Sequence, residues 1–332
     1  MPPASPAPPS SRRSLVIASY AAVCTLWGST YLAIAVALEG FPPYLLGALR
    51  FLLAGSALLA VARWRKEPWP ERRQWLGAAV AGLFLFVLGN GLIAAAERSL
   101  SSSVTSVLAA TMPLWMTVFG RLLGTPVRRS EAVGVALGLV GVLVMNTSGE
   151  LRASPSGVVM VLLSPMAWAV GSLVGQRLPS PPGLMRVGTQ MLTGGLQMAV
   201  VSLALGERMA HLPSGRAVAA AMYLLVAGSL IGFSAYSYLL QHTRPAVATS
   251  YAYVNPVIAM ALGILLAGET FDVAGAVGAA IILAAILLVG LARHHRPQAV
   301  VLRERPRAPD EPDDLDGSAA RRGRQRAAYQ HD

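Results

Sequence analysis

The sequence has little charge and almost no cysteine. Only 13% of its 332 residues are charged and 54% are hydrophobic, whereas a typical soluble domain is about one quarter charged. One or two soluble cores cannot bury that much apolar surface. The composition therefore excludes a soluble or disordered chain for the bulk of the sequence. The single cysteine, Cys24, excludes an intrachain disulfide and a thiolate metal cluster.

Cofactor signals are also missing. None of the five histidines lies in the middle of an apolar run, which argues against haem or a buried zinc ion. The chain has no phosphate-loop sequence, so direct ATP drive is not expected, and we predict no cofactor and no metal. The apolar runs are continuous rather than alternating, aromatic residues are few and glycine is abundant. These features favour packed membrane helices over a β-barrel.

Long apolar runs dominate what remains. A membrane helix needs about 20 mostly apolar residues, and the first run is too long for a cleaved signal sequence. Residues 1–14 and 292–332 lack apolar periodicity and are expected to be disordered. The runs predict ten spans: Leu15–Leu38, Tyr44–Ala62, Trp75–Ala96, Ser102–Leu123, Ala132–Met145, Gly157–Gln176, Leu184–Leu205, Ala217–Leu240, Ala246–Ala267 and Val273–Leu291.

The distribution of basic residues predicts the orientation of these spans. With a cytoplasmic N-terminus, the inside connectors hold eleven Lys and Arg residues and the outside loops hold four, both tails excluded. Cytoplasmic loops are the ones enriched in Lys and Arg, so both termini are expected in the cytoplasm. The net charge of +11 then reflects topology, and no nucleic-acid partner is expected.

An internal repeat relates the two halves of the chain. A shift of 143 residues aligns Gly28-Ser29 with Gly171-Ser172, Pro113 with Pro256, and Gly120 with Gly263. Each half holds five spans, an odd number, so the second copy must be inverted in the membrane. Inverted repeats are typical of alternating-access transporters, which place their site near the midplane between the halves.

Several motifs resemble the EamA domain of the drug/metabolite transporter (DMT) superfamily. They include Trp27-Gly28-Ser29-Thr30-Tyr31, Ala48-Leu49-Arg50-Phe51, Met112-Pro113-Leu114-Trp115, the segment from Pro245 to Pro256, and Gly268-Glu269-Thr270. The resemblance covers about residues 15–291. It implies an all-α polytopic membrane protein, with ten transmembrane helices in two inverted five-helix EamA repeats at residues 15–146 and 154–291. It also implies export of small metabolites or amino-acid-like compounds.

Arg50 is the most informative single residue. It lies roughly 9–12 Å into the second span at about 1.5 Å per residue, where a charge costs on the order of 2.5–3.5 kcal/mol. Ser29, Thr30 and Asn90 lie at similar depth and could complete a polar cluster. The guanidinium either meets a substrate carboxylate or gates the path, or it holds helices together by bonding backbone carbonyls and Asn90.

Aromatic and amide side chains at mid-span depth extend this candidate site. Rings with a few polar groups suit an organic solute that has an apolar portion. The alternative for each ring is packing between helices. The remaining predicted substrate-binding residues are Trp27, Trp168, Tyr236, Tyr251, Tyr253 and Asn255.

Glu97 is the acidic residue with the best claim to a place within a span. It either takes up a proton during transport or forms an interfacial pair with Arg98 or another helix end. Glu269 and Asp272 are expected to act as caps or loop contacts.

Three prolines, Pro113, Pro165 and Pro256, fall within predicted helices and remove a backbone donor there. They act either as hinges or as static kinks.

The sequence thus predicts a secondary active transporter that exports small organic metabolites, amino-acid-like compounds or drugs across the bacterial inner membrane. Protons are a candidate coupling ion. The partners are the small-molecule substrate and the lipid bilayer, and the oligomeric state is left open between monomer and homodimer. An importer or facilitator of the same fold, and a membrane sensor or structural protein, are the alternatives. An intramembrane enzyme is disfavoured because no Asp, His or Cys cluster marks a membrane face.

Overall fold

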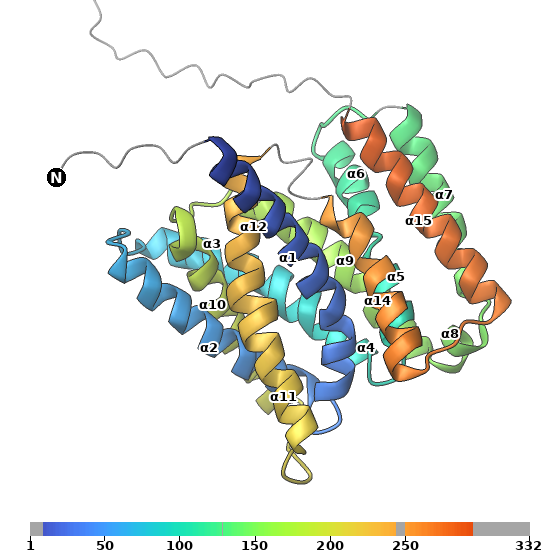
Figure 1. The fold of residues 1–332 in the computed structure, drawn as a ribbon, viewed down its shortest axis with the longest axis horizontal. Helices are drawn as coiled ribbons and strands as arrows, with labels where there is room; N and C mark the ends of the chain where they lie inside the picture. The colour runs from blue at the N-terminus through green and yellow to red at the C-terminus, as the bar shows by residue number, and fades with distance from the viewer. Residues whose placement is uncertain (1–8, 128, 244–249, 295–332) are drawn as a thin grey trace, which may run out of the picture. The chain divides into compact units, whose positions relative to one another are not determined.

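The structure is a computed structural model that describes residues 9–127, 129–243 and 250–294. Every element in these residues is a helix (Figure 1). The expected disorder of residues 1–8 and 295–332 lies outside the described part of the chain. Helix α1 (Pro9–Ala37) begins before the predicted span at Leu15, because a helix that is already nucleated extends through polar residues at little cost.

Seven helical stretches in the described residues are long and apolar enough to cross a membrane. They are Arg13–Ala37 in α1, Pro43–Trp64 (α2), Arg72–Ala96, Ser102–Leu122, Pro155–Gly175 (α9), Gly215–Leu239 and Val273–Leu291 in α15 (Val273–His294). Three of them are built from shorter elements. Arg72–Ala96 comprises α3 (Arg72–Gly82), η1 (Leu83–Gly91) and α4 (Leu92–Ala96); Ser102–Leu122 comprises α5 (Ser102–Ala109) and α6 (Met112–Leu122); Gly215–Leu239 comprises α11 (Gly215–Tyr223), η2 (Leu224–Ile231) and the start of α12 (Gly232–His242).

The three other predicted spans coincide with helices that are shorter or less apolar than these seven. Helices α7 (Arg129–Met145) and α14 (Tyr251–Ala267) have only 17 residues each, and α10 (Gly183–Ala204) interrupts its apolar residues with Arg186, Gln190 and Gln197. A short helix, α8 (Gly149–Ala153), follows α7. The start of the ninth predicted span, residues 246–249, lies outside the described residues. The number of ten membrane helices therefore stays a prediction.

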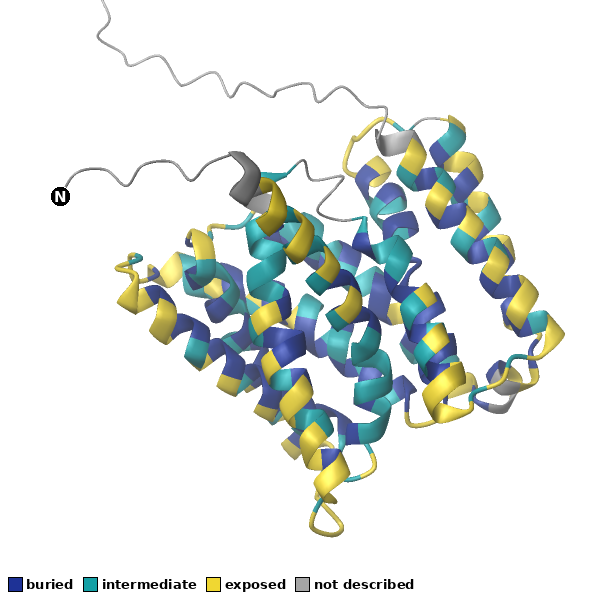
Figure 2. Cartoon of the chain, viewed as in Figure 1, coloured by how far each residue is buried: buried dark blue, intermediate teal, exposed yellow. Residues whose placement is uncertain are grey.

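Helices α7 and α15 lie side by side (Figure 1) and run antiparallel. Gly134 packs against Val289, Gly138 against Ala285, and Gly141 against Ile282. The contacts move forward along α7 and backward along α15. The glycines of α7 thus form a close-packing face, because small residues let two helices approach closely. Large apolar side chains such as Leu143, 67% exposed, cover the outward faces, which are coloured as exposed in Figure 2.

Helices α2 and α10 form the second tightly packed pair, and two glutamates hold its ends. Glu67 follows α2 and accepts a hydrogen bond from the Met185 backbone N–H in the first turn of α10, at 2.9 Å. Glu207 follows α10 and accepts from the backbone N–H groups of Tyr44 and Leu45, at 3.2 and 2.8 Å, in the first turn of α2. A carboxylate at a helix N-terminus satisfies free N–H groups and the helix dipole. The reciprocal contacts make the two helices antiparallel.

Local breaks interrupt several helices near their middle. The segments η1 and η2 are π-helical, a conformation that is often found at functional sites. Pro165 and Pro256 lie inside α9 and α14, as the sequence predicts. Pro113 instead lies in the first turn of α6. The expectation of a proline inside a continuous helix is wrong there, because the chain turns at Ala110 and Thr111 and proline is favourable in a first turn.

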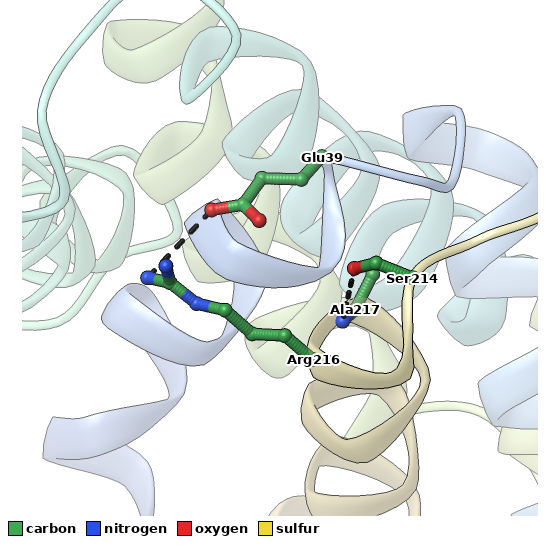
Figure 3. A network of polar contacts seen from close by, with 4 residues as sticks. All are labelled: Glu39, Ser214, Arg216 and Ala217. Atoms are coloured by element: carbon green, nitrogen blue, oxygen red, sulfur yellow. Dashed lines mark hydrogen bonds and ion pairs between the residues drawn. The ribbon is translucent and has the colours of Figure 1, made fainter.

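The end of α1 meets the start of α11 through an exposed ion pair. Arg216 lies 3.7 Å from Glu39, and the two side chains are 68% and 49% exposed (Figure 3). The Ser214 hydroxyl accepts from the Ala217 backbone N–H and caps α11. An ion pair this exposed contributes only about 0–1 kcal/mol, so it supports the connection without carrying a function.

Candidate functional site

A cavity lies where helices from both halves of the chain meet. Helices α1, α2, α4, α5, α9, α12 and α14 contribute side chains to its wall, together with η1 and the first residue of α6. The breaks described above lie around it. The turn at Ala110, the prolines Pro165 and Pro256, and Asn90 of η1 all line the cavity. Helix breaks therefore coincide with the wall of the cavity.

Seven of the ten predicted substrate-binding residues line this cavity. They are Trp27, Thr30, Arg50, Asn90, Trp168, Tyr251 and Asn255. They come from five separate elements, so the fold brings together residues that are up to 228 positions apart, from 27 to 255. The depth of each residue in its predicted span was enough to place them at one level.

The three others point elsewhere. The Ser29 hydroxyl contacts the Tyr223 hydroxyl of α11 at 2.6 Å, Tyr236 packs behind the cavity wall with its ring centroid 5.2 Å from that of Trp27, and Tyr253 packs against Gly290 of α15. Consecutive residues on a helix are turned by about 100°. Depth alone could not show which of two neighbours faces the cavity.

Arg50 is 8% exposed and makes one side-chain hydrogen bond in the described residues, from Nε to the Ser229 Oγ at 2.7 Å. Its guanidinium carbon also lies 4.8 Å from the centroid of the Phe51 ring. The predicted bond to Asn90 is absent, because the Asn90 amide donates to the Leu85 carbonyl within its own π-helical segment. No acidic side chain pairs with Arg50 in the described part of the chain. A buried cation thus faces the cavity with donors to spare.

The aromatic wall is held in a fixed arrangement. Trp27 Nε1 donates to the Gly228 carbonyl at 3.0 Å, and its ring lies edge-on to Phe233 and Tyr251, with centroids 4.9 and 4.8 Å apart. Beside them, the Asn255 amide donates to the Cys24 carbonyl at 3.2 Å when its nitrogen is oriented toward α1. These contacts fix ring positions between α1, α12 and α14.

Sequence reasoning missed several groups of this site. Ser229, the partner of Arg50, lies in η2, where it is the single polar side chain of the segment. Ser164 lines the cavity one residue before Pro165 and donates to the Gly89 carbonyl at 2.9 Å. Tyr31, Ser106 and Phe233 also line the cavity. A polar residue within an apolar run was the available signal for the serines, and Tyr31 lies within a motif already singled out.

Glu97 lies outside the cavity wall but close to it. The side chain is 8% exposed, and neither carboxyl oxygen has a hydrogen-bond partner. The alternative of a pair with Arg98 is wrong, because no such ion pair exists in the described residues. Within the same residues, no three His, Cys, Asp or Glu side chains gather closely enough to hold a metal ion.

Comparisons with known proteins match this architecture. The profile of the EamA-like transporter family matches residues 14–147 and 155–291. The chain is 39% identical over 282 residues to the uncharacterized inner membrane transporter YedA of Escherichia coli K12, covering 85% of this chain and 92% of that protein. It is 27% identical over 288 residues to the probable amino-acid metabolite efflux pump of Salmonella typhimurium LT2, covering 80% and 91%. A solved structure described as "Crystal structure of protein" has the same fold, with a TM-score of 0.59 at 21% identity, covering 85% and 99%.

Proposed function

The chain belongs to the EamA-like transporter family and carries the EamA domain twice, and on that premise we propose that it is a secondary transporter that exports small organic solutes across the bacterial inner membrane. Its substrate carries a carboxylate or another anionic group together with an apolar portion. Amino-acid-like metabolites and drugs of this kind fit the proposal.

The observation that carries the proposal is the unpaired guanidinium of Arg50 in the cavity wall. An isolated charge away from water is expensive unless it is paired, and among the described residues the Ser229 hydroxyl is the one hydrogen-bond partner of the guanidinium. An anionic group on a solute would supply the missing charge. Trp27, Trp168 and Tyr251 would then cover the apolar portion of the solute, since all three line the same space.

Alternating access between two inverted repeats would move the solute past this site. The antiparallel pairs α2/α10 and α7/α15 support the inversion, because they join equivalent helices of the two halves in opposite directions. The π-helical segments support the repeat itself, because adding 143 to residues 83–91 gives 226–234, which overlaps η2 at residues 224–231. With both termini in the cytoplasm, α5 begins and α14 ends at the outer face.

Export is proposed over import on the family resemblance and on the printed name of the Salmonella relative. An importer or a facilitator would use the same cavity, so geometry alone does not separate the directions. A sensor or structural role is less well supported, because neither needs a cavity with an unpaired charge.

The test is a comparison of metabolite export by cells that overexpress the protein and cells that lack it. We expect overexpression to raise the external level of one or a few organic anions, and Arg50→Gln to abolish that rise at equal expression. Collapse of the proton gradient should abolish export if protons drive it. Unchanged external metabolites in all strains, with the protein present in the membrane, would overturn the proposal.

A further inference from the structure

Near the end of the cavity that α5 lines, a cluster joins the start of α5 to the segment after α14. We call it the latch and define it as the Glu269 carboxylate with Ser102 and Ser103. Glu269 Oε1 accepts from the Ser102 backbone N–H at 2.9 Å and from its hydroxyl at 2.8 Å. Glu269 Oε2 accepts from the Ser103 backbone N–H at 3.0 Å and from the Ser103 hydroxyl. With four donors on two oxygens, this carboxylate is fully hydrogen-bonded.

The local sequence builds the latch. Gly268 ends α14 in the left-handed conformation, with φ of 68°, and so turns the chain back toward α5. The serines follow the N-cap Ser101, at the helix end where free N–H groups favour an anion. Gly263 leaves the space that the latch fills, because a Cβ there would overlap both the Glu269 carboxylate and the Ser103 hydroxyl.

The helix that the latch holds contributes to two spaces. Ser106 and Ala109 of α5 line the central cavity. Val104 and Thr270, which directly follow the latch residues in sequence, line a surface pocket. The latch therefore fixes the start of the helix whose next turns line both the cavity and this pocket.

Glu97 is a second carboxyl beside the latch, with opposite surroundings. Both of its oxygens are buried without a partner, and the titratable groups that act on it electrostatically are Glu269 and Tyr31 of the cavity wall. Helices α5 and α9, packed near it, carry no titratable side chain, and Arg50 and Tyr44 of α2 make no ion pair with it. The adjoining Arg98 is exposed. A carboxylate beside another carboxylate, without a donor or cation, is unstable. Glu97 therefore carries a proton while the latch is closed.

We propose that Glu97 and the latch form a proton-sensitive gate at this end of the cavity, closed when Glu97 is protonated and released when it ionises. On opening, water reaches Glu97, one proton passes from its carboxyl group to that water, and the carboxylate that forms is hydrated. The inference rests on the proposed transport function and adds the residues that would couple it to protons. A proton lost while the gate is closed would place two like charges side by side and favour opening.

The test is hydrogen–deuterium exchange of the full chain in lipid nanodiscs between pH 5 and 8, with rates corrected for intrinsic exchange. The reporters are the Ser102 and Ser103 amides, whose protection measures the ratio of closed to open latch. If closing binds one proton, protection should fall up to tenfold for each pH unit. Glu97→Gln should stay protected at every pH, and Glu269→Gln should lose at least tenfold protection at every pH.

A matched control lies in the same molecule. The amides of Tyr44 and Leu45 are held by Glu207 in the same way, and we expect their protection to show no such pH dependence. Their unchanged protection in the Glu97 and Glu269 variants also reports an intact fold. The gate is overturned if Glu97→Gln keeps the wild-type pH slope, if Glu269→Gln is as protected as wild type, or if both pairs of amides share one slope. If the wild-type protein exports no metabolite while its Ser102 and Ser103 amides show the expected pH dependence, the proposed transport function is wrong and the gate is not.

Discussion

Replacing Arg50 by glutamine separates a substrate-binding cation from a structural one. The change removes a buried charge, whose burial at a helix centre costs on the order of 2.5–3.5 kcal/mol, and this raises the free energy of unfolding. It also removes the charged hydrogen bond to Ser229, a class that contributes about 1.5–3 kcal/mol. The two terms have opposite signs and similar size. We therefore expect the free energy of unfolding of Arg50→Gln to stay within about 2 kcal/mol of wild type.

Ligand binding should respond far more strongly. One lost charge-assisted hydrogen bond of about 1.5–3 kcal/mol corresponds to a Kd raised about 10- to 150-fold. The assay uses protein in nanodiscs and a panel of apolar carboxylic acids with their neutral amides. Wild type should prefer the acids, and Arg50→Gln should bind acid and amide alike.

The control for this prediction is Arg186→Gln. Arg186 lies in the α2/α10 helix pair and donates to the Gly175 carbonyl at 2.8 Å, but it does not line the cavity. Its replacement should leave the preference for acids unchanged. If Arg50→Gln keeps the wild-type preference, or loses the 3–5 kcal/mol of unfolding free energy typical of a broken buried pair, Arg50 ties helices together and the substrate assignment is wrong.

Three further predictions concern the scaffold. Backbone N–H groups of Gly149 and Gly275 hold the pKa of Asp272 below its usual range, so its stabilisation is full above about pH 4 and is lost as the pH falls through the lowered folded-state pKa. Asp272→Asn should then lower the Tm at neutral pH, and a gap in Tm to wild type that does not narrow as the pH falls below about 4 would contradict this. Gly141→Leu should overpack the α7/α15 contact and cost about 1–3 kcal/mol in denaturant unfolding; an unchanged midpoint would refute it. Trp27→Phe leaves the buried Gly228 carbonyl without its donor, so thermal unfolding should show a loss of about 1–3 kcal/mol, with unaltered unfolding as the contrary result.

Much of the candidate site could be predicted from depth along the apolar runs. Trp27, Arg50 and Asn255 each lie near the middle of a predicted span, and all three line the cavity. Depth did not predict direction, so Ser29 was placed with its neighbour Thr30 although the two point to different helices. Nor did it predict the partner of Arg50, because a bond between α2 and η2 spans 179 residues of sequence.

The sequence by itself determined that the chain is a helical membrane protein of the EamA family, because hydropathy and short motifs are local properties that need no knowledge of contacts. The tertiary structure alone decided how Glu97 and Glu269 differ. Both are glutamates at the ends of apolar runs, and their residue type predicts the same chemistry for each. Packing gives Glu269 four donors on α5 and leaves Glu97 none. Hydrogen bonding and burial depend on neighbours that are distant in sequence, and they give these two carboxyl groups opposite surroundings.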